Sequence, residues 1–126
     1  MVSMAQPEWH GGPDRGVGMI YELKMYRAQT GKRDAVVKRF AVHAAPIIDR
    51  LGGKVLDAWI AQSDPDRFYY IVGFPDEDAR QKVWSDFARD PEWQAVKADS
   101  EQGGPLLAEQ TTELLLPAFA EGRSTE

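Results

Sequence analysis

The sequence contains no cysteine and only two histidines among its 126 residues. Without cysteine the chain forms no disulfide bond and offers no thiolate as a nucleophile or metal ligand. The histidines, His10 and His43, form neither an HxH nor an HExxH spacing, which is typical of zinc sites. We therefore predict no metal centre, and any catalytic chemistry has to come from other side chains.

Basic charge is also scarce. The 15 lysines and arginines are outnumbered by 20 aspartates and glutamates, which gives a formal net charge of -5. No block of basic residues is present to follow a phosphate backbone, so we predict no nucleic-acid partner. No run of about 18 apolar residues occurs, and residues 1–18 contain no apolar core of the signal-peptide kind. A soluble cytoplasmic protein without a membrane partner is expected.

The length predicts a single domain, because domains cluster at roughly 100 to 150 residues. Residues 1–18 contain four glycines and two prolines without hydrophobic periodicity. Such a composition favours a flexible N-terminal extension. The folded domain is expected to cover residues 19–117, and residues 118–126 are expected to form a C-terminal tail.

Alternating apolar and polar residues predict four β-strands. The first covers residues 19–27. The second and third, at 54–62 and 67–74, are separated by a Ser-Asp-Pro-Asp turn and are expected to form a hairpin. The last strand, at 109–116, ends before Pro117.

Three helices are expected between these strands. The first runs from a cap at Thr30 to about Leu51 and ends at Gly52, since glycine favours the left-handed conformation after a helix. Asp76 and Asp90 are predicted to cap the second and third helices. The order β-α-β-β-α-α-β predicts an α+β, ferredoxin-like fold, with an antiparallel sheet and helices on one face.

The face of the predicted sheet that carries no helix holds several large apolar side chains. Its predicted members are Trp59, Tyr70, Val72, Phe74 and Leu114, together with Glu22, Asp57 and Thr112. A surface facing water seldom gathers so many large apolar groups. We therefore predict that this face is buried in a homodimer. The alternative is that part of it lies under the third helix or the C-terminal tail.

Several segments of the chain resemble members of the NIPSNAP family. They are MIYELKMY at 19–26, HAAPIIDRLGGKVLDAW at 43–59 and DPEWQAV at 90–96. The resemblance implies a dimeric α+β barrel, in which the sheets of two subunits close together. It does not fix an activity, because the wider superfamily includes cofactor-free monooxygenases, cyclases, isomerases and haem-degrading enzymes. The chain departs from the family pattern at Tyr70, where the family often has a histidine.

His43 is the first candidate for proton transfer. On a helical wheel it lies just outside the apolar stripe that includes Val36 and Phe40. Pro46 removes the donor for the carbonyl of Val42 and is expected to bend the helix, opening a gap near His43 between helix and sheet. A histidine titrates near neutral pH and can act there as an acid or a base. The alternatives are a packing role and, as a narrower hypothesis, haem ligation by His43.

Glu22 is the second catalytic candidate, because it is a charged residue inside a predicted strand. It can act as a general base or as a polar anchor for a substrate carbonyl. The alternative is a structural ion pair with Lys24 on the same face. Four aromatic residues are the candidates for substrate binding through hydroxyl donors or ring contacts: Tyr26, Trp59, Tyr70 and Trp84.

Together these residues favour a small homodimeric enzyme or enzyme-like protein of secondary metabolism. Its predicted ligand is an apolar or aromatic oxygenated metabolite. The predicted chemistry is proton transfer without a cofactor, as in isomerisation, cyclisation or oxidation, with His43 and Glu22 as the catalytic groups. The alternatives are a non-catalytic dimeric module that binds a ligand or partner, and a haem-binding protein.

Overall fold

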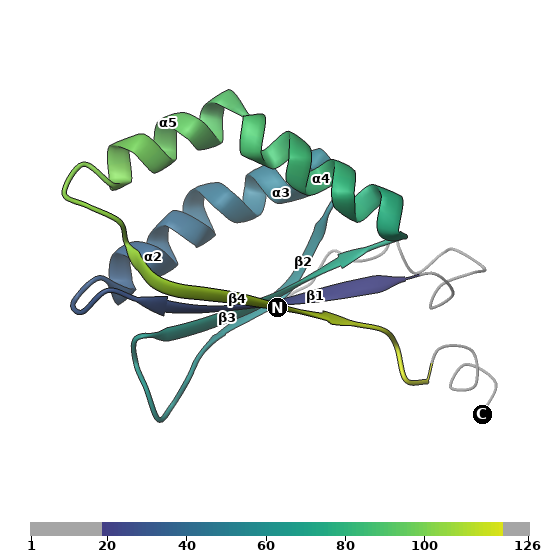
Figure 1. Cartoon of the computed structure of the whole chain (residues 1–126), viewed down its shortest axis with the longest axis horizontal. Helices are drawn as coiled ribbons and strands as arrows, with labels where there is room; N and C mark the ends of the chain where they lie inside the picture. The colour runs from purple at the N-terminus through teal and green to yellow at the C-terminus, as the bar shows by residue number, and fades with distance from the viewer. Residues whose placement is uncertain (1–18, 120–126) are drawn as a thin grey trace.

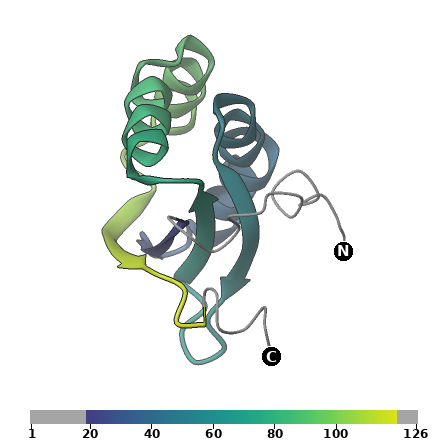
Figure 2. The same ribbon diagram turned by 90° about the vertical axis from the view of Figure 1, so that its right-hand side faces the viewer.

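A computed structural model describes residues 19–119 of the chain. The extension predicted at 1–18 and most of the tail predicted at 118–126 therefore lie outside the described residues. One antiparallel sheet carries all the described helices on one of its faces (Figures 1 and 2). This arrangement confirms the predicted α+β, ferredoxin-like fold.

The sheet has four strands in the order β2-β3-β1-β4, so β1 and β3 are central and β2 and β4 form the edges. The bounds are β1 Ile20–Ala28, β2 Lys54–Ile60, β3 Arg67–Phe74 and β4 Leu107–Leu115. All three neighbouring pairs are antiparallel, and β2 and β3 form the predicted hairpin.

The predicted first helix is present but is interrupted. It consists of α2 (Arg33–Arg39), a π-helical segment η1 (Phe40–Ala44) and α3 (Ala45–Leu51). Thr30 does not cap it, because the N-cap position is Lys32 and no side chain bonds there. Gly52 ends the helix with a φ of 114°, as predicted.

The π-helical segment accounts for the proline in the middle of this helix. Within it the N–H of Ala45 donates to the carbonyl of Phe40, five residues back. Pro46 has no N–H to donate and its ring needs space beside the carbonyl of Val42. The wider π turn provides that space, so the chain continues as a helix after it.

The remaining helices begin where the sequence predicts. The Asp76 carboxylate accepts a hydrogen bond from the N–H of Ala79 and caps α4 (Glu77–Arg89). The Asp90 carboxylate accepts from the N–H of Trp93 and caps α5 (Pro91–Ser100). Both caps satisfy N–H groups that the first helical turn leaves without a partner.

The core lies between the helices and the face of the sheet that they cover, called here the covered face. The strand β3 contributes Tyr70, Val72 and Phe74 to this core, where they pack against Phe40 and Ile48 of the first helix. The prediction that these three β3 residues lie on the bare face is therefore wrong. Both faces of β3 carry large apolar side chains, so alternation alone did not show which one the helices cover.

The strand register also moves other residues from their predicted face. Glu22 pairs with Val72 and Leu114, which places Glu22 and Leu114 on the covered face as well. Between Val55 and Asp57 a bulge shifts the register of β2. Because a bulge reverses the alternation of side chains, Trp59 lies opposite Tyr69 on the bare face, where it was predicted, and is thereby separated from Tyr70.

The other face of the sheet, called here the open face, has no helix of the described residues packed on it (Figure 2). By the strand register, its large apolar side chains are Tyr21, Leu23, Met25, Trp59, Tyr69, Ile71 and Leu115. Trp59 is 48% exposed. The structure thus keeps an apolar sheet face without a cover, and of the large apolar residues predicted for that face only Trp59 lies on it.

Candidate functional site

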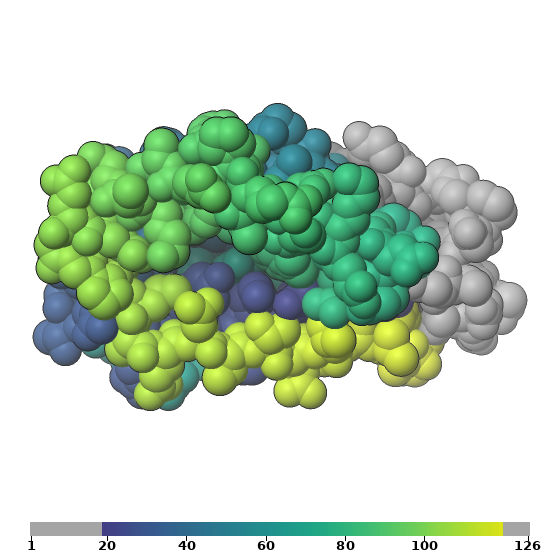
Figure 3. Space-filling model, turned by 45° about the horizontal axis from the view of Figure 1, so that its top comes forward, coloured from purple at the N-terminus to yellow at the C-terminus, as the bar shows by residue number. Residues whose placement is uncertain are grey.

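A cavity of about 360 Å³ lies between the covered face of the sheet and the helices. Figure 3 shows its mouth as a hollow between α4 and α5 on one side and β4 on the other, with β1 at the bottom. We call it the aromatic cavity. It is lined by Lys24, Tyr26, Val36, Arg39, Phe40, Ala44, Tyr70, Trp84, Phe87, Trp93, Lys97, Glu101, Pro105, Leu107 and Gln110.

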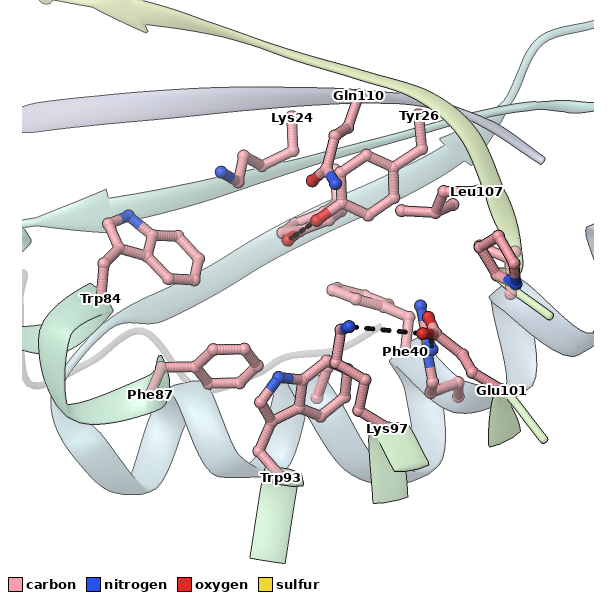
Figure 4. Close-up of a pocket in the computed structure, with 15 residues that line it drawn as sticks. Lys24, Tyr26, Phe40, Trp84, Phe87, Trp93, Lys97, Glu101, Leu107 and Gln110 are labelled. Carbon is pink, nitrogen blue, oxygen red and sulfur yellow. Dashed lines mark hydrogen bonds and ion pairs between the residues drawn. The ribbon is translucent and has the colours of Figure 1, made fainter. Parts of the chain in front are cut away.

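Aromatic rings form much of the wall of this cavity. The rings of Phe40 and Tyr70 lie 4.2 Å apart between centroids, and those of Phe87 and Trp93 lie 4.7 Å apart. Trp84 meets Phe87 edge to face at 5.7 Å. Figure 4 shows Phe87 and Trp93 facing Tyr26 across the cavity. Such walls suit a flat apolar molecule, since aromatic rings prefer stacked or edge-on neighbours.

Two tyrosine hydroxyls meet at the sheet side of the cavity. The hydroxyl oxygens of Tyr26 on β1 and Tyr70 on β3 are 2.9 Å apart, so one phenol donates to the other. Burial is the largest cause that raises the pKa of Tyr26, and it raises the pKa of Tyr70 well above its ordinary value. Both phenols are therefore neutral near pH 7, and the pair can donate a hydrogen bond to an oxygen atom in the cavity.

Glu22 lies beside the cavity and is 3% exposed. Its Oε1 accepts from the indole Nε1 of Trp84 at 2.6 Å and from Nη1 of Arg80 at 3.3 Å. Its Oε2 accepts from Nζ of Lys24 at 3.3 Å. The ion pair with Lys24 that the sequence offered as an alternative role is thus present. These donors stabilise the buried carboxylate and fix the indole of Trp84 in the cavity wall.

A second charged cluster lies on the helix side of the cavity. Nη1 of Arg39 donates to Glu101 at 2.9 Å and to the Ser100 hydroxyl at 3.0 Å, and Nζ of Lys97 donates to Glu101 at 3.3 Å. Hydrogen bonding to Arg39 is the largest cause that lowers the pKa of Glu101. Glu101 is therefore an ionised carboxylate in the cavity wall at neutral pH.

The structure places His43 away from the aromatic cavity. It lies in a separate depression of about 480 Å³ between the first helix and α5, which it shares with Lys38, Val96 and Asp99. A gap between the first helix and the sheet does exist, and it is the aromatic cavity. It is lined by Phe40 of the π-helical segment, and His43 does not line it. The predicted catalytic role of His43 stays a prediction.

Three of the six predicted site residues come together in one place. Tyr26, Tyr70 and Trp84 line the aromatic cavity, and Glu22 supports its wall. Trp59 lies on the opposite face of the sheet.

Four residues of the cavity wall were not predicted as site residues: Arg39, Trp93, Lys97 and Glu101. One signal was available, because Arg39 is a charged residue between Val36 and Phe40, which both belong to the apolar stripe of the helix. A charge in such a position is usually paired or functional.

Residues 19–119 were expected to hold neither a metal centre nor a membrane-spanning helix. Within that range no cluster of three or more histidines, aspartates and glutamates could hold a metal ion. None of the helices in the described part of the chain is long and apolar enough to cross a membrane.

Comparisons with known proteins agree with this architecture. A family model described as NIPSNAP matches residues 21–120. No curated protein matches the chain.

Solved structures show the same fold. An uncharacterized NIPSNAP-like domain protein from Burkholderia xenovorans has a TM-score of 0.69 at 22% identity, over 79% of this chain and 85% of its own. A NIPSNAP family protein from Agrobacterium tumefaciens has a TM-score of 0.69 at 23% identity, over 79% and 86%. A putative antibiotic biosynthesis monooxygenase from Chloroflexus aurantiacus has a TM-score of 0.54 at 22% identity, over 79% and 93%.

Proposed function

Because the chain belongs to the NIPSNAP family, we propose that it is a small homodimeric, enzyme-like protein for an apolar oxygenated metabolite. The similar fold of a putative monooxygenase supports an enzyme-like role. The ligand binds in the aromatic cavity, and a proton moves without a cofactor. The observation that carries this proposal is the pair of neutral phenols, Tyr26 and Tyr70, at one side of an aromatic slot. A planar carbonyl compound fits such a slot and places its oxygen at the phenols.

The phenol pair supplies the acid half of the chemistry. When a carbonyl compound loses a proton from its α-carbon, negative charge develops on the carbonyl oxygen. A hydrogen bond donated by a fixed phenol stabilises that charge, and removing one such donor commonly lowers kcat by about 10² to 10³. The hydrogen bond between Tyr26 and Tyr70 holds the donor in position before the ligand arrives.

A carboxylate is proposed to accept the proton. Both carboxylates accept hydrogen bonds on their two oxygens, but only Glu101 lines the cavity, whereas Glu22 is 3% exposed and lies behind Trp84. We therefore assign the base to Glu101 and keep Glu22 as the residue that positions Trp84. Catalysis by His43 remains a separate prediction, since it would require a ligand in the His43 depression.

Exchange of the α-protons of 2-tetralone tests the proposal. This neutral, planar, enolisable ketone is incubated with the full chain in D2O, and loss of its α-proton signals is followed by NMR. We expect faster exchange with the protein than with buffer, and a loss of at least about tenfold for Tyr70→Phe. Tyr69→Phe is the matched control, because Tyr69 is the next residue on β3 and lies on the open face.

The same experiment separates the proposal from its alternatives. If 2-tetralone binds by calorimetry but its exchange is not accelerated, the protein is a ligand-binding module without this activity. If 2-tetralone does not bind, the assignment of the cavity is wrong. Haem ligation by His43 is tested separately by the absorbance spectrum after haemin is added to wild-type protein and to His43→Ala.

The open face supports the homodimer. Seven large apolar side chains lie on one sheet face that no described helix covers, and Trp59 among them is about half exposed. Contiguous exposed apolar side chains of this kind favour an interaction surface. A second copy of the chain can cover this face with its own open face, since a two-fold interface joins the same surface on both subunits. Light scattering at micromolar concentration should give the mass of two chains, and the mass of one chain would contradict this part of the proposal.

A further inference from the structure

The guanidinium of Arg39 is buried yet only partly bonded. The side chain is 9% exposed and lies between the aromatic cavity and the His43 depression, since it lines both. Among residues 19–119, only its Nη1 has hydrogen-bond partners, which are Glu101 and Ser100. The N–H groups on Nε and Nη2 have none within this part of the chain. A buried N–H group without an acceptor lowers the stability of the protein, because it has lost its hydrogen bond to water. The unbonded N–H groups of Arg39 therefore favour a ligand that supplies an acceptor.

The positive charge of Arg39 interacts with the two phenols of the aromatic cavity. Burial raises the pKa of Tyr26 and Tyr70, and the positive charge of Arg39 opposes that rise for both phenols. The guanidinium is therefore close enough to interact with the phenol pair. Its planar group also lies over the ring of Trp93, 5.2 Å from the centroid, which holds it against the aromatic wall.

The cavity carries a surplus of positive charge in an acidic protein. Its charged lining consists of three cations, Lys24, Arg39 and Lys97, and one carboxylate, Glu101. The whole chain has a formal net charge of -5. Positive groups gathered in a concave, aromatic site in such a chain favour an anionic ligand over a neutral one.

We propose that the ligand of this cavity is an aromatic carboxylate, whose carboxylate group binds the free edge of Arg39 while its ring lies between the aromatic walls. This inference rests on the proposed function and names the chemical class of its ligand. Guanidinium and carboxylate are both planar and form two parallel hydrogen bonds, which fits a slot with flat walls. The cavity volume of about 360 Å³ suits a small molecule of one or two rings.

Glu101 lies beside the proposed ligand site and carries the same charge as the ligand. Its carboxylate accepts from Nη1 of Arg39 and from Lys97, and it leaves the Nε and Nη2 edge of Arg39 to an incoming carboxylate. Glu101 follows the end of α5 and precedes Gly104, which has a positive φ of 117°. A carboxylate bound to the free edge of Arg39 would lie close to the negative charge of Glu101, so the affinity for the ligand should depend on that repulsion.

Isothermal titration of the full chain with trans-cinnamate and with cinnamamide tests the proposal. The two probes have the same ring and nearly the same shape, but only cinnamate is charged at pH 7. We expect cinnamate to bind at least about tenfold more tightly. Arg39→Gln should remove that preference by weakening cinnamate alone, whereas Arg89→Gln, an exposed arginine on α4, should leave both affinities unchanged.

Two further variants keep the test decisive if Arg39→Gln does not fold. Arg39→Lys retains the charge but cannot form two parallel hydrogen bonds, so the preference for cinnamate should fall. Glu101→Gln removes the neighbouring negative charge, so cinnamate should bind about threefold or more tightly than to wild-type protein. Circular dichroism melting curves show whether each variant is folded at the temperature of the titration.

The outcomes distinguish this inference from the proposed function. Equal affinities of wild-type protein for cinnamate and cinnamamide would overturn the inference, and unchanged binding of 2-tetralone would then leave the proposed function standing. A preference for cinnamate that persists in Arg39→Gln and Arg39→Lys would also overturn it. If cinnamate, cinnamamide and 2-tetralone all fail to bind, both proposals are wrong.

Discussion

The two faces of the sheet have similar residues and different surroundings. Each carries tyrosines, large aliphatic side chains and a glutamate. Tyr70 and Glu22 lie on the covered face, and Tyr69 and Glu113 lie on the open face. On the covered face the polar groups are bonded to one another and to the helices. The open face has no second layer in the described chain. The comparison shows that the opposing layer, more than residue type, decides whether an aromatic residue builds a core, a cavity or an interface.

The largest effect is expected from a change in the core of the covered face. Ile48 is fully buried, so Ile48→Ala should lower the free energy of unfolding by about 2 to 5 kcal/mol, through lost burial and a cavity. Urea unfolding followed by circular dichroism measures this loss. Ile71→Ala on the open face is the matched change and should cost clearly less. Equal losses would mean that Ile71 is buried as fully as Ile48, either by part of the chain itself or by a second subunit.

The next effect concerns association. Ile71→Asp puts a charge in the middle of the open face, where a second subunit would have to bury it, so the dimer should dissociate. Size-exclusion chromatography with light scattering should then give half the mass at unchanged helix content. Val42→Asp provides the control, because Val42 is an exposed apolar residue on the helix layer. Dissociation by Val42→Asp instead would place the interface on the helices.

A smaller effect separates the tyrosines of the two faces. Tyr70→Phe leaves the buried hydroxyl of Tyr26 without its partner, and should lower the free energy of unfolding by about 0.5 to 1.5 kcal/mol. Tyr69→Phe on the same strand removes no hydrogen bond that is formed within residues 19–119. Its unfolding curve should coincide with that of wild-type protein, and a comparable loss would show that Tyr69 has a partner in the dimer.

The smallest effect is a pH dependence of the covered face. Arg39 lowers the pKa of Glu101 in the folded protein. A carboxyl group whose pKa is lowered by folding stabilises the protein above its unfolded pKa, near 4.3, and this contribution is lost as the pH falls through the folded pKa. Glu101→Gln should therefore lower stability at pH 7 by less than about 1 kcal/mol and by nothing at pH 2. Glu113→Gln, on the open face, is the control for the unfolding measurements at both pH values.

The elements of the fold could be predicted because each depends on local chemistry. Asp76 and Asp90 cap helices through their own turns, and Gly52 takes a backbone conformation that other residues avoid. The family resemblance also rested on short segments that the structure retains as strands and helices. None of these signals needs contacts between distant parts of the chain.

The faces and the site could be predicted only in part, because they depend on contacts between distant segments. Trp59 and Tyr70 were predicted on the same face, but the bulge after Val55 places them on opposite faces, and nothing in the sequence of β2 indicates a bulge there. Tyr26 and Tyr70 were predicted individually, but their hydrogen bond needs the register of β1 against β3. Arg39 was missed because its partners belong to α5 and the residue that follows it.

The π-helical segment has a consequence for the phase of the helix. Val36, Phe40, Ala44 and Ile48 are all buried at a strict spacing of four residues. In a regular α-helix four residues turn by about 400°, so each such step moves the side chain about 40° around the axis and the row would wind away from the sheet. A π turn holds more residues per turn and reduces this drift. Apolar residues spaced by four, with a proline within the row, are therefore a sequence signature of a locally underwound helix.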